Sequence, residues 1–132
     1  MATAGRSAEI PLLVIVDDDA STRISTQRLI RSFGFRANVF PSAQEFLDSG
    51  CAQDTACLIL DLRMPSMNGL QLQRLLASRS YQIPIIFVTV HGNNQDQREA
   101  MKAGAVDFLR KPVSKETLLK AIQTALMHPT LR

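Results

Sequence analysis

The sequence predicts an α/β fold in which one open parallel sheet is covered by helices on both faces. Short runs of consecutive apolar residues, typical of strands buried on both sides, alternate with segments of helical periodicity. Such alternation is typical of strand–helix–strand units, whose right-handed crossovers leave few topologies open. At 132 residues, with 45% hydrophobic and 20% charged residues, the chain is expected to form one domain with a single core.

The apolar runs predict five strands, and the segments between and after them predict five helices. In chain order, the strands are expected at 12–16, 37–40, 57–60, 85–88 and 106–109. The helices are expected at 20–33, 42–49, 68–79, 94–103 and 115–127. Along the chain, Asp19 is placed to cap the first helix and Gly34 to end it, while Ser42 opens the second with a capping box. Gly104 is placed to end the fourth helix and Ser114 to cap the fifth.

Residues 10–128 are expected to form this domain, with tails at 1–9 and 129–132. The net charge of +3 comes from scattered basic residues, which disfavours nucleic-acid binding by this domain. Cys51 and Cys57 have no metal-ligand spacing and are expected to be reduced thiols. No segment is long and apolar enough to span a membrane and residues 1–9 lack a signal-peptide core, so a cytoplasmic protein is expected.

Polar side chains follow four of the predicted strands at the point where each strand ends. Asp17 and Asp18 follow the first strand, Asp61 the third, Thr89 the fourth and Lys111 the fifth. Ligands of open parallel sheets bind outside the carboxyl ends of the strands, so these side chains predict one polar site. Taken singly, a lysine is usually solvated and a threonine at a strand end is usually a cap. Their joint occurrence at four strand ends favours a site.

The acidic residues predict a metal ion. Two carboxylates about 4 Å apart repel by about 4 kcal/mol at an effective dielectric constant near 20. Convergence of Asp17, Asp18 and Asp61 therefore predicts a cation, and oxygen ligands of this kind suit Mg²⁺. Asp61 beside a metal and the ammonium group of Lys111 indicates phosphoryl transfer to a carboxylate, with Thr89 donating a hydrogen bond.

Four segments resemble the receiver domain of two-component response regulators over nearly the whole chain. They are Val-Asp-Asp-Asp (16–19), Leu-Asp-Leu-Arg-Met-Pro-Ser-Met-Asn-Gly (60–69), Val-Thr-Val-His-Gly (88–92) and Ala-Met-Lys-Ala-Gly-Ala-Val-Asp-Phe-Leu-Arg-Lys-Pro (100–112). The last two are most similar to the nitrogen-fixation-type subfamily, whose members usually carry a DNA-binding domain after the receiver. The resemblance implies a flavodoxin-like sheet of order 2-1-3-4-5 and control of transcription through a domain absent from this chain.

The resemblance also implies roles for the site residues. Asp61 would accept a phosphoryl group from a sensor histidine kinase, so the chain would not be an enzyme but a phosphoacceptor that catalyses its own phosphorylation and dephosphorylation. Mg²⁺ would be held by Asp18, Asp61 and the backbone carbonyl of Arg63, with Asp17 acting through water. The Lys111–Pro112 bond would be cis.

The family switch moves Thr89 to the phosphoryl group and makes room for an aromatic residue on the fifth strand. That residue is Phe108, which lacks the hydroxyl of the usual tyrosine and is either a switch or an ordinary core residue. Arg63, Val90 and His91 would flank the phosphoryl group and tune its lifetime, with Val90 restricting small phosphodonors. His91 is equally compatible with a plain surface role.

The fourth helix, fifth strand and fifth helix form the surface through which the family dimerises or binds partners. Polar residues that line it here are Gln97, Arg98, Lys102, Asp107 and Arg110, and a merely solvated face is the alternative. Two other functions fit less well. An aspartyl-phosphate phosphatase needs an acid two residues after its nucleophile, where Arg63 stands, and a nucleotide or flavin binder needs a glycine-rich loop after the first strand.

Overall fold

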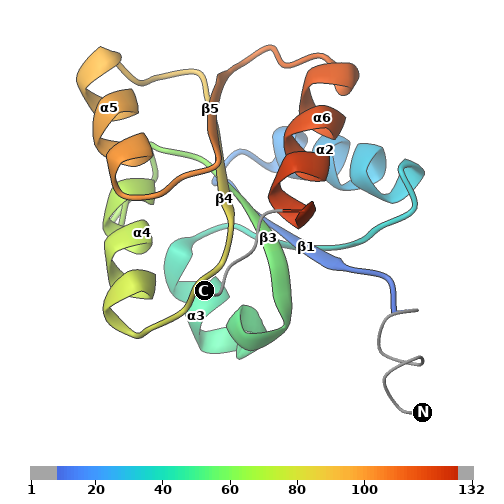
Figure 1. Ribbon diagram of the computed structural model, residues 1–132, viewed down its shortest axis with the longest axis horizontal. Coiled ribbons are helices and arrows are strands. Elements are labelled where there is room, and N and C mark those ends of the chain that lie inside the picture. The colour runs from blue at the N-terminus through green and yellow to red at the C-terminus, as the bar shows by residue number, and fades with distance from the viewer. Residues whose placement is uncertain (1–8, 128–132) are drawn as a thin grey trace.

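The computed structural model describes residues 9–127, which form a five-stranded parallel sheet with helices on both faces (Figure 1). The spatial order of the strands is β2-β1-β3-β4-β5, as predicted. The strands are β1 (Leu12–Val16), β2 (Arg36–Phe40), β3 (Thr55–Leu60), β4 (Ile85–Thr89) and β5 (Asp107–Arg110). The predicted tail 129–132 lies outside the described residues, and the predicted tail 1–9 overlaps them only at Glu9.

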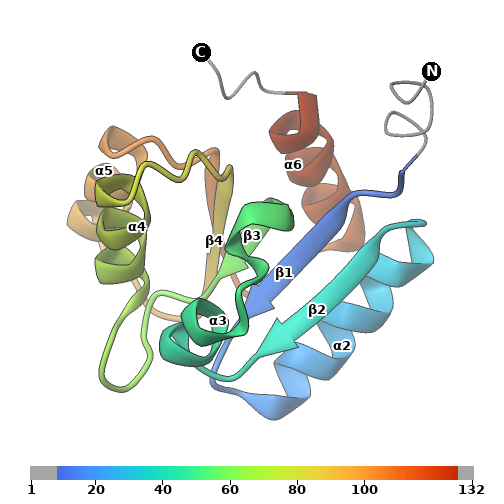
Figure 2. The ribbon, with the colours of Figure 1, turned by 90° about the horizontal axis from the view of Figure 1, so that it is seen from below.

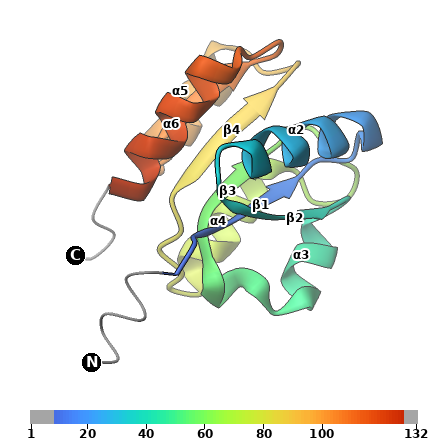
Figure 3. The ribbon, with the colours of Figure 1, turned by 90° about the vertical axis from the view of Figure 1, so that its right-hand side faces the viewer.

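Five α-helices connect and flank the strands, and each of their ends lies within one residue of the prediction. They are α2 (Ala20–Ser32), α3 (Ala43–Ser49), α4 (Gly69–Ser78), α5 (Asn94–Lys102) and α6 (Lys115–Met127). The helices α2 and α6 cover one face of the sheet, while α3, α4 and α5 cover the other (Figures 2 and 3). Between residues 9 and 127, no helix has the length and apolarity that crossing a membrane requires.

Alternate residues of the strands fill two separate cores, because successive side chains of a strand point to opposite faces. On β1, Leu13 and Ile15 pack with Ile30 of α2 and Ile122 of α6. The other residues of β1 pack on the opposite face, in a core that also holds Phe46 of α3 and three leucines of α4. The consecutive apolar runs seen in the sequence are therefore required by burial on both sides.

Some local predictions need correction. Strand β3 begins at Thr55 rather than at Cys57, and a short 3₁₀ helix (Cys51–Asp54) precedes it. The hydroxyl of Thr55 donates to the carbonyl of Cys51 at 2.8 Å, which holds this turn against the start of the strand. At Ser42 the structure has only half of the predicted capping box, the bond from the amide of Glu45 to the serine hydroxyl.

Other caps agree with the prediction. Asp19 accepts a hydrogen bond from the amide of Thr22 and caps α2, and Ser114 accepts one from the amide of Thr117. Gly34 and Gly104 have φ angles of 97° and 105°, which glycine adopts without strain. Complete capping boxes form at two helices where none was predicted, α4 and α5, through Asn68 with Gln71 and Asn93 with Asp96.

Candidate functional site

The site lies at the carboxyl edge of the sheet, and main-chain hydrogen bonds fix its two central acids there. The amide of Asp61 donates to the carbonyl of Val16 at 2.9 Å, and the amide of Asp17 donates to the carbonyl of Phe40 at 3.2 Å. Both residues thus continue the parallel ladder by one position beyond their strands. Asp17 is 3% exposed and Asp61 is 8% exposed, whereas Asp18 is open to solvent.

Three carboxylates converge as the sequence predicted. Asp17, Asp18 and Asp61 each offer an oxygen atom, and these atoms all lie within 4.8 Å of one another. Asp18 also borders an open hollow of about 400 Å³, formed with Arg63, Met64 and other residues of the loop after Asp61. The position of the acids and the hardness of their oxygens fit a Mg²⁺ ion, which takes one or two protein carboxylates and keeps coordination positions for other ligands.

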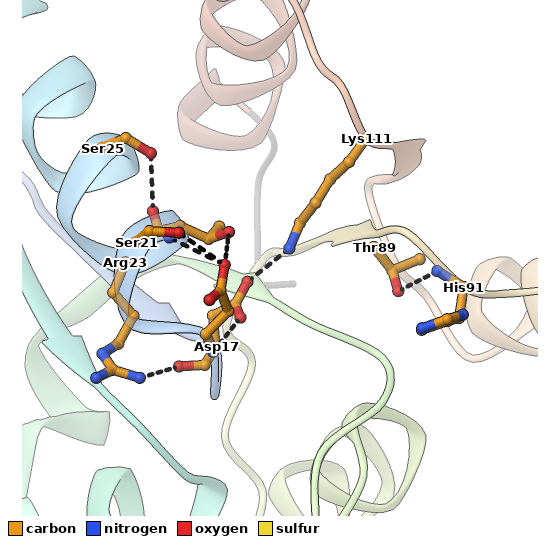
Figure 4. Close-up of polar contacts among 9 residues, drawn as sticks. Asp17, Ser21, Arg23, Ser25, Thr89, His91 and Lys111 are labelled. Carbon is orange, nitrogen blue, oxygen red and sulfur yellow. Dashed lines mark hydrogen bonds and ion pairs between the residues drawn. The ribbon is translucent and has the colours of Figure 1, made fainter.

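Lys111 contacts Asp17, which the sequence did not predict. Its ammonium lies 2.9 Å from one carboxylate oxygen of Asp17, while the other oxygen accepts from the amide of Asp19 at 2.9 Å (Figure 4). Arg23 donates to the main-chain carbonyl of the same residue at 2.8 Å. Both oxygens of Asp17 are therefore engaged, and direct metal ligation falls more readily to Asp18 and Asp61.

Asp61 lies in an environment that resists its negative charge. Burial raises the pKa of its carboxyl group, and the charges of Asp17 and Asp18 raise it further. The ammonium of Lys111 and the hydroxyl of Thr89 act in the opposite direction but do not outweigh burial. A cation or another charge-neutralising group bound here would relieve this conflict.

Asp19, by contrast, belongs to the helix cap and not to the site. Its carboxylate accepts from the hydroxyls of Thr22 at 2.6 Å and Ser21 at 3.1 Å. These two hydrogen bonds lower the pKa of Asp19. The predicted role of Asp19 as a helix cap is confirmed.

Thr89 is fully buried at the end of β4, and its hydroxyl oxygen accepts from the amide of His91 at 3.1 Å (Figure 4). The hydroxyl hydrogen is left to be donated to another group. Val90 and His91, which follow, are both exposed, Val90 to 65%. The Lys111–Pro112 peptide bond is cis.

Phe108 is buried, with 5% of its surface exposed. Its ring packs against Phe87 at a centroid distance of 5.8 Å, and the guanidinium of Arg110 lies 5.4 Å from its centroid. The phenylalanine ring has no hydroxyl group whose burial would be unfavourable, and it points inward in this structure.

Two contacts made by arginine side chains were not predicted from the sequence. The guanidinium of Arg63 lies 3.7 Å from the carboxylate of Asp96 near the start of α5. Arg110 donates to the carbonyl of Gly92 at 3.0 Å. Both contacts depend on the paths of loops, which the hydrophobic periodicity of the sequence does not predict. The opposite charges of Arg63 and Asp96 were the only signal for their contact in the sequence.

Comparison with known proteins identifies relatives along most of the chain. A family model for the response regulator receiver domain matches residues 13–123. The response regulator protein TmoT of Ectopseudomonas mendocina is 48% identical over 115 residues, which are 87% of this chain and 52% of that protein. The transcriptional regulatory protein FixJ of Bradyrhizobium diazoefficiens is 38% identical over 114 residues, 86% of this chain and 56% of the relative. The chain thus spans about half the length of these relatives.

Solved structures give the same result. The crystal structure of FixJ-N is 38% identical, with a TM-score of 0.81, and the match covers 91% of this chain and 96% of that one. The structure of the response regulator StyR is 43% identical, with a TM-score of 0.83, covering 90% of this chain and 60% of that chain.

Proposed function

The chain belongs to the response regulator receiver domain family, and we propose that its Asp61 accepts a phosphoryl group from a sensor histidine kinase. The predicted resemblance to the nitrogen-fixation-type subfamily is confirmed, because FixJ is among its relatives. The observation that carries the proposal is the crowding of Asp61 by two other carboxylates beside a lysine ammonium at one edge of the sheet. That arrangement places a carboxylate nucleophile where cations are required.

In the proposed reaction, a carboxylate oxygen of Asp61 forms a bond to phosphorus while the phosphorus–nitrogen bond of the kinase phosphohistidine breaks. The electron pair of the broken bond stays on the imidazole nitrogen. The ammonium of Lys111 exchanges Asp17 for a phosphoryl oxygen, and the hydroxyl of Thr89 donates to another. Mg²⁺ held by Asp18, Asp61 and the backbone carbonyl of Arg63 would supply the positive charge that lets carboxylates and phosphoryl oxygens share the site.

The same proposal covers the partners of the protein. The surface formed by α5, β5 and α6 would change on phosphorylation and would serve for dimerisation or for contact with an output domain. Relatives bear the names of transcriptional regulators, which supports control of transcription, with DNA bound by a domain other than this one. In this proposal the protein acts in the cytoplasm, and it catalyses only its own phosphorylation and dephosphorylation.

The primary experiment is intact mass spectrometry after incubation with a small phosphodonor and Mg²⁺. We expect one phosphoryl adduct on the native chain and none on the Asp61→Asn variant or in the presence of a chelator. A native chain that a permissive histidine kinase also fails to label would refute the function. Formation of the adduct without Asp61 would refute the assignment of the site.

Val90 gives a second arm to this experiment. Its side chain is exposed immediately after Thr89, where it would narrow the approach of small phosphodonors. We expect Val90→Ala to be labelled faster by a small phosphodonor and at an unchanged rate by a kinase. Labelling by the small donor that is no faster would contradict a restricting role for Val90.

A further inference from the structure

The first turn of α5 is attached to the rest of the protein largely through polar contacts. Within α5, all of which the structure describes, Ala100 is the only buried residue. Arg110 of β5 reaches across to this turn. Its guanidinium donates to the carbonyl of Gly92, before the helix, at 3.0 Å and to the side-chain oxygen of Gln97, within the helix, at 3.4 Å. One arginine therefore connects the end of β5 to both the loop and the helix.

The same guanidinium covers the ring of Phe108 at 5.4 Å from the centroid, an arrangement in which a cation and an aromatic face attract each other. The loop closes on this ring from another side. Gly92 has a φ of 126°, and a Cβ atom on it would lie 2.8 Å from Cζ of Phe108. Only glycine permits this approach, and phenylalanine leaves Cζ free of the hydroxyl that a tyrosine would carry. Gly92, Phe108 and Arg110 thus form one closed contact, here called the Arg110 latch.

We propose that Arg110 is a positioning residue of the switch: through the latch it holds the β4–α5 loop closed over Phe108 and ties the first turn of α5 to β5. The inference rests on the proposed function, because the loop begins at Thr89. The hydroxyl oxygen of Thr89 now accepts from the amide of His91. When the hydroxyl turns to a phosphoryl group on Asp61, this contact is lost, while the latch still holds the far end of the loop.

Two capping boxes make the test specific. The amides of Asn93 and Asp96 form the box at the start of α5, and those of Asn68 and Gln71 form a matching box at the start of α4. Only the first lies beside the latch. Hydrogen exchange at these amides, measured on the whole chain, therefore reports the local effect of Arg110 against an internal reference.

We expect Arg110→Ala to speed exchange at the α5 box at least about tenfold, because it removes two hydrogen bonds from a charged donor, and to leave the α4 box unchanged. Arg110→Lys keeps the charge but not the planar fork that reaches two oxygens, so it is expected to restore less than half of the lost protection. Arg28→Ala removes an exposed arginine on α2 and serves as the matched control. Equal exchange in wild type and Arg110→Ala, equal acceleration in both boxes, or full rescue by lysine would overturn the proposal.

Repeating the exchange after phosphorylation separates this inference from the proposed function. Intact mass on the same samples reports whether Asp61 is labelled. In labelled protein we expect phosphorylation to loosen the loop, and to do so by a larger factor in Arg110→Ala, where no latch remains to hold the far end after the contact between Thr89 and His91 is lost. An equal factor in both proteins would refute the positioning role. If neither protein is labelled, the proposed function fails, while exchange without phosphodonor still decides whether the latch exists.

Discussion

Replacing Asp61 with asparagine removes one of three carboxylates whose oxygens lie within 4.8 Å of one another, and we expect the metal-free protein to gain stability at pH 7. At that separation and an effective dielectric constant near 20, two unit charges repel by about 3.5 kcal/mol. Lys111, 2.9 Å from Asp17, offsets much of the repulsion from that residue, and Asp18 is screened by solvent. The expected net gain in the free energy of unfolding is about 1 to 3 kcal/mol.

The assay is urea denaturation of the Asp61→Asn variant and wild type in a buffer that contains a chelator. Asp54→Asn, which removes an exposed acid at the opposite end of β3, is the control and should change stability by less than about 0.5 kcal/mol. Magnesium at about one hundred times its dissociation constant should then stabilise the wild type by about 2.7 kcal/mol and the variant by less. An Asp61→Asn variant no more stable than wild type in chelator would refute the electrostatic reasoning.

The pH dependence of this difference has a definite sign. The folded protein raises the pKa of Asp61 above its ordinary value of 3.8, so folding favours the protonated carboxyl group. The destabilisation by Asp61 is therefore absent below that ordinary value and grows as the pH rises through it toward the higher pKa of the folded state. The advantage of the asparagine variant should shrink as the pH is lowered toward 4, and an advantage independent of pH would contradict this origin.

Three further predictions concern the support of the site. Lys111→Met should lower the free energy of unfolding of the metal-free protein by about 2 kcal/mol, because it leaves the buried carboxylate of Asp17 without its partner. An unchanged midpoint of urea denaturation would show that this ion pair does not contribute to stability. Gly69→Ala should cost about 2 kcal/mol or more, since its Cβ would lie 2.5 Å from a main-chain oxygen and 2.9 Å from the ring of Phe87; a thermal midpoint equal to wild type would mean that the backbone relaxes freely there. Burial raises the pKa of the Cys57 thiol to about 12. Native protein treated with iodoacetamide at pH 8 should therefore be alkylated only at the partly exposed Cys51. A second adduct that appears without denaturant would contradict the burial of Cys57.

The strands were predictable because each is a continuous apolar run, and burial on both faces requires such runs. The exact ends of the strands were less predictable. Thr55 belongs to β3 because it pairs with Leu12 of β1, and Arg110 belongs to β5 because it pairs with Thr89 of β4. Neither residue is apolar, so pairing with a neighbouring strand, and not composition, decides its membership.

The sequence by itself determined which chemical groups meet at the carboxyl edge of the sheet. Alternation of strands and helices makes the sheet parallel, a parallel sheet brings all strand ends to one edge, and the residues after those ends include Asp17, Asp61, Thr89 and Lys111.

Only the tertiary structure decided which side chains contact one another at this edge of the sheet and in the loops beside it. Lys111 contacts Asp17, Arg63 points to Asp96 on α5, and Arg110 closes the loop at Gly92. Each contact joins segments far apart in the chain and depends on distances of a few ångströms between loops. Local pattern fixes the order of residues along each strand, but it carries no information about those distances.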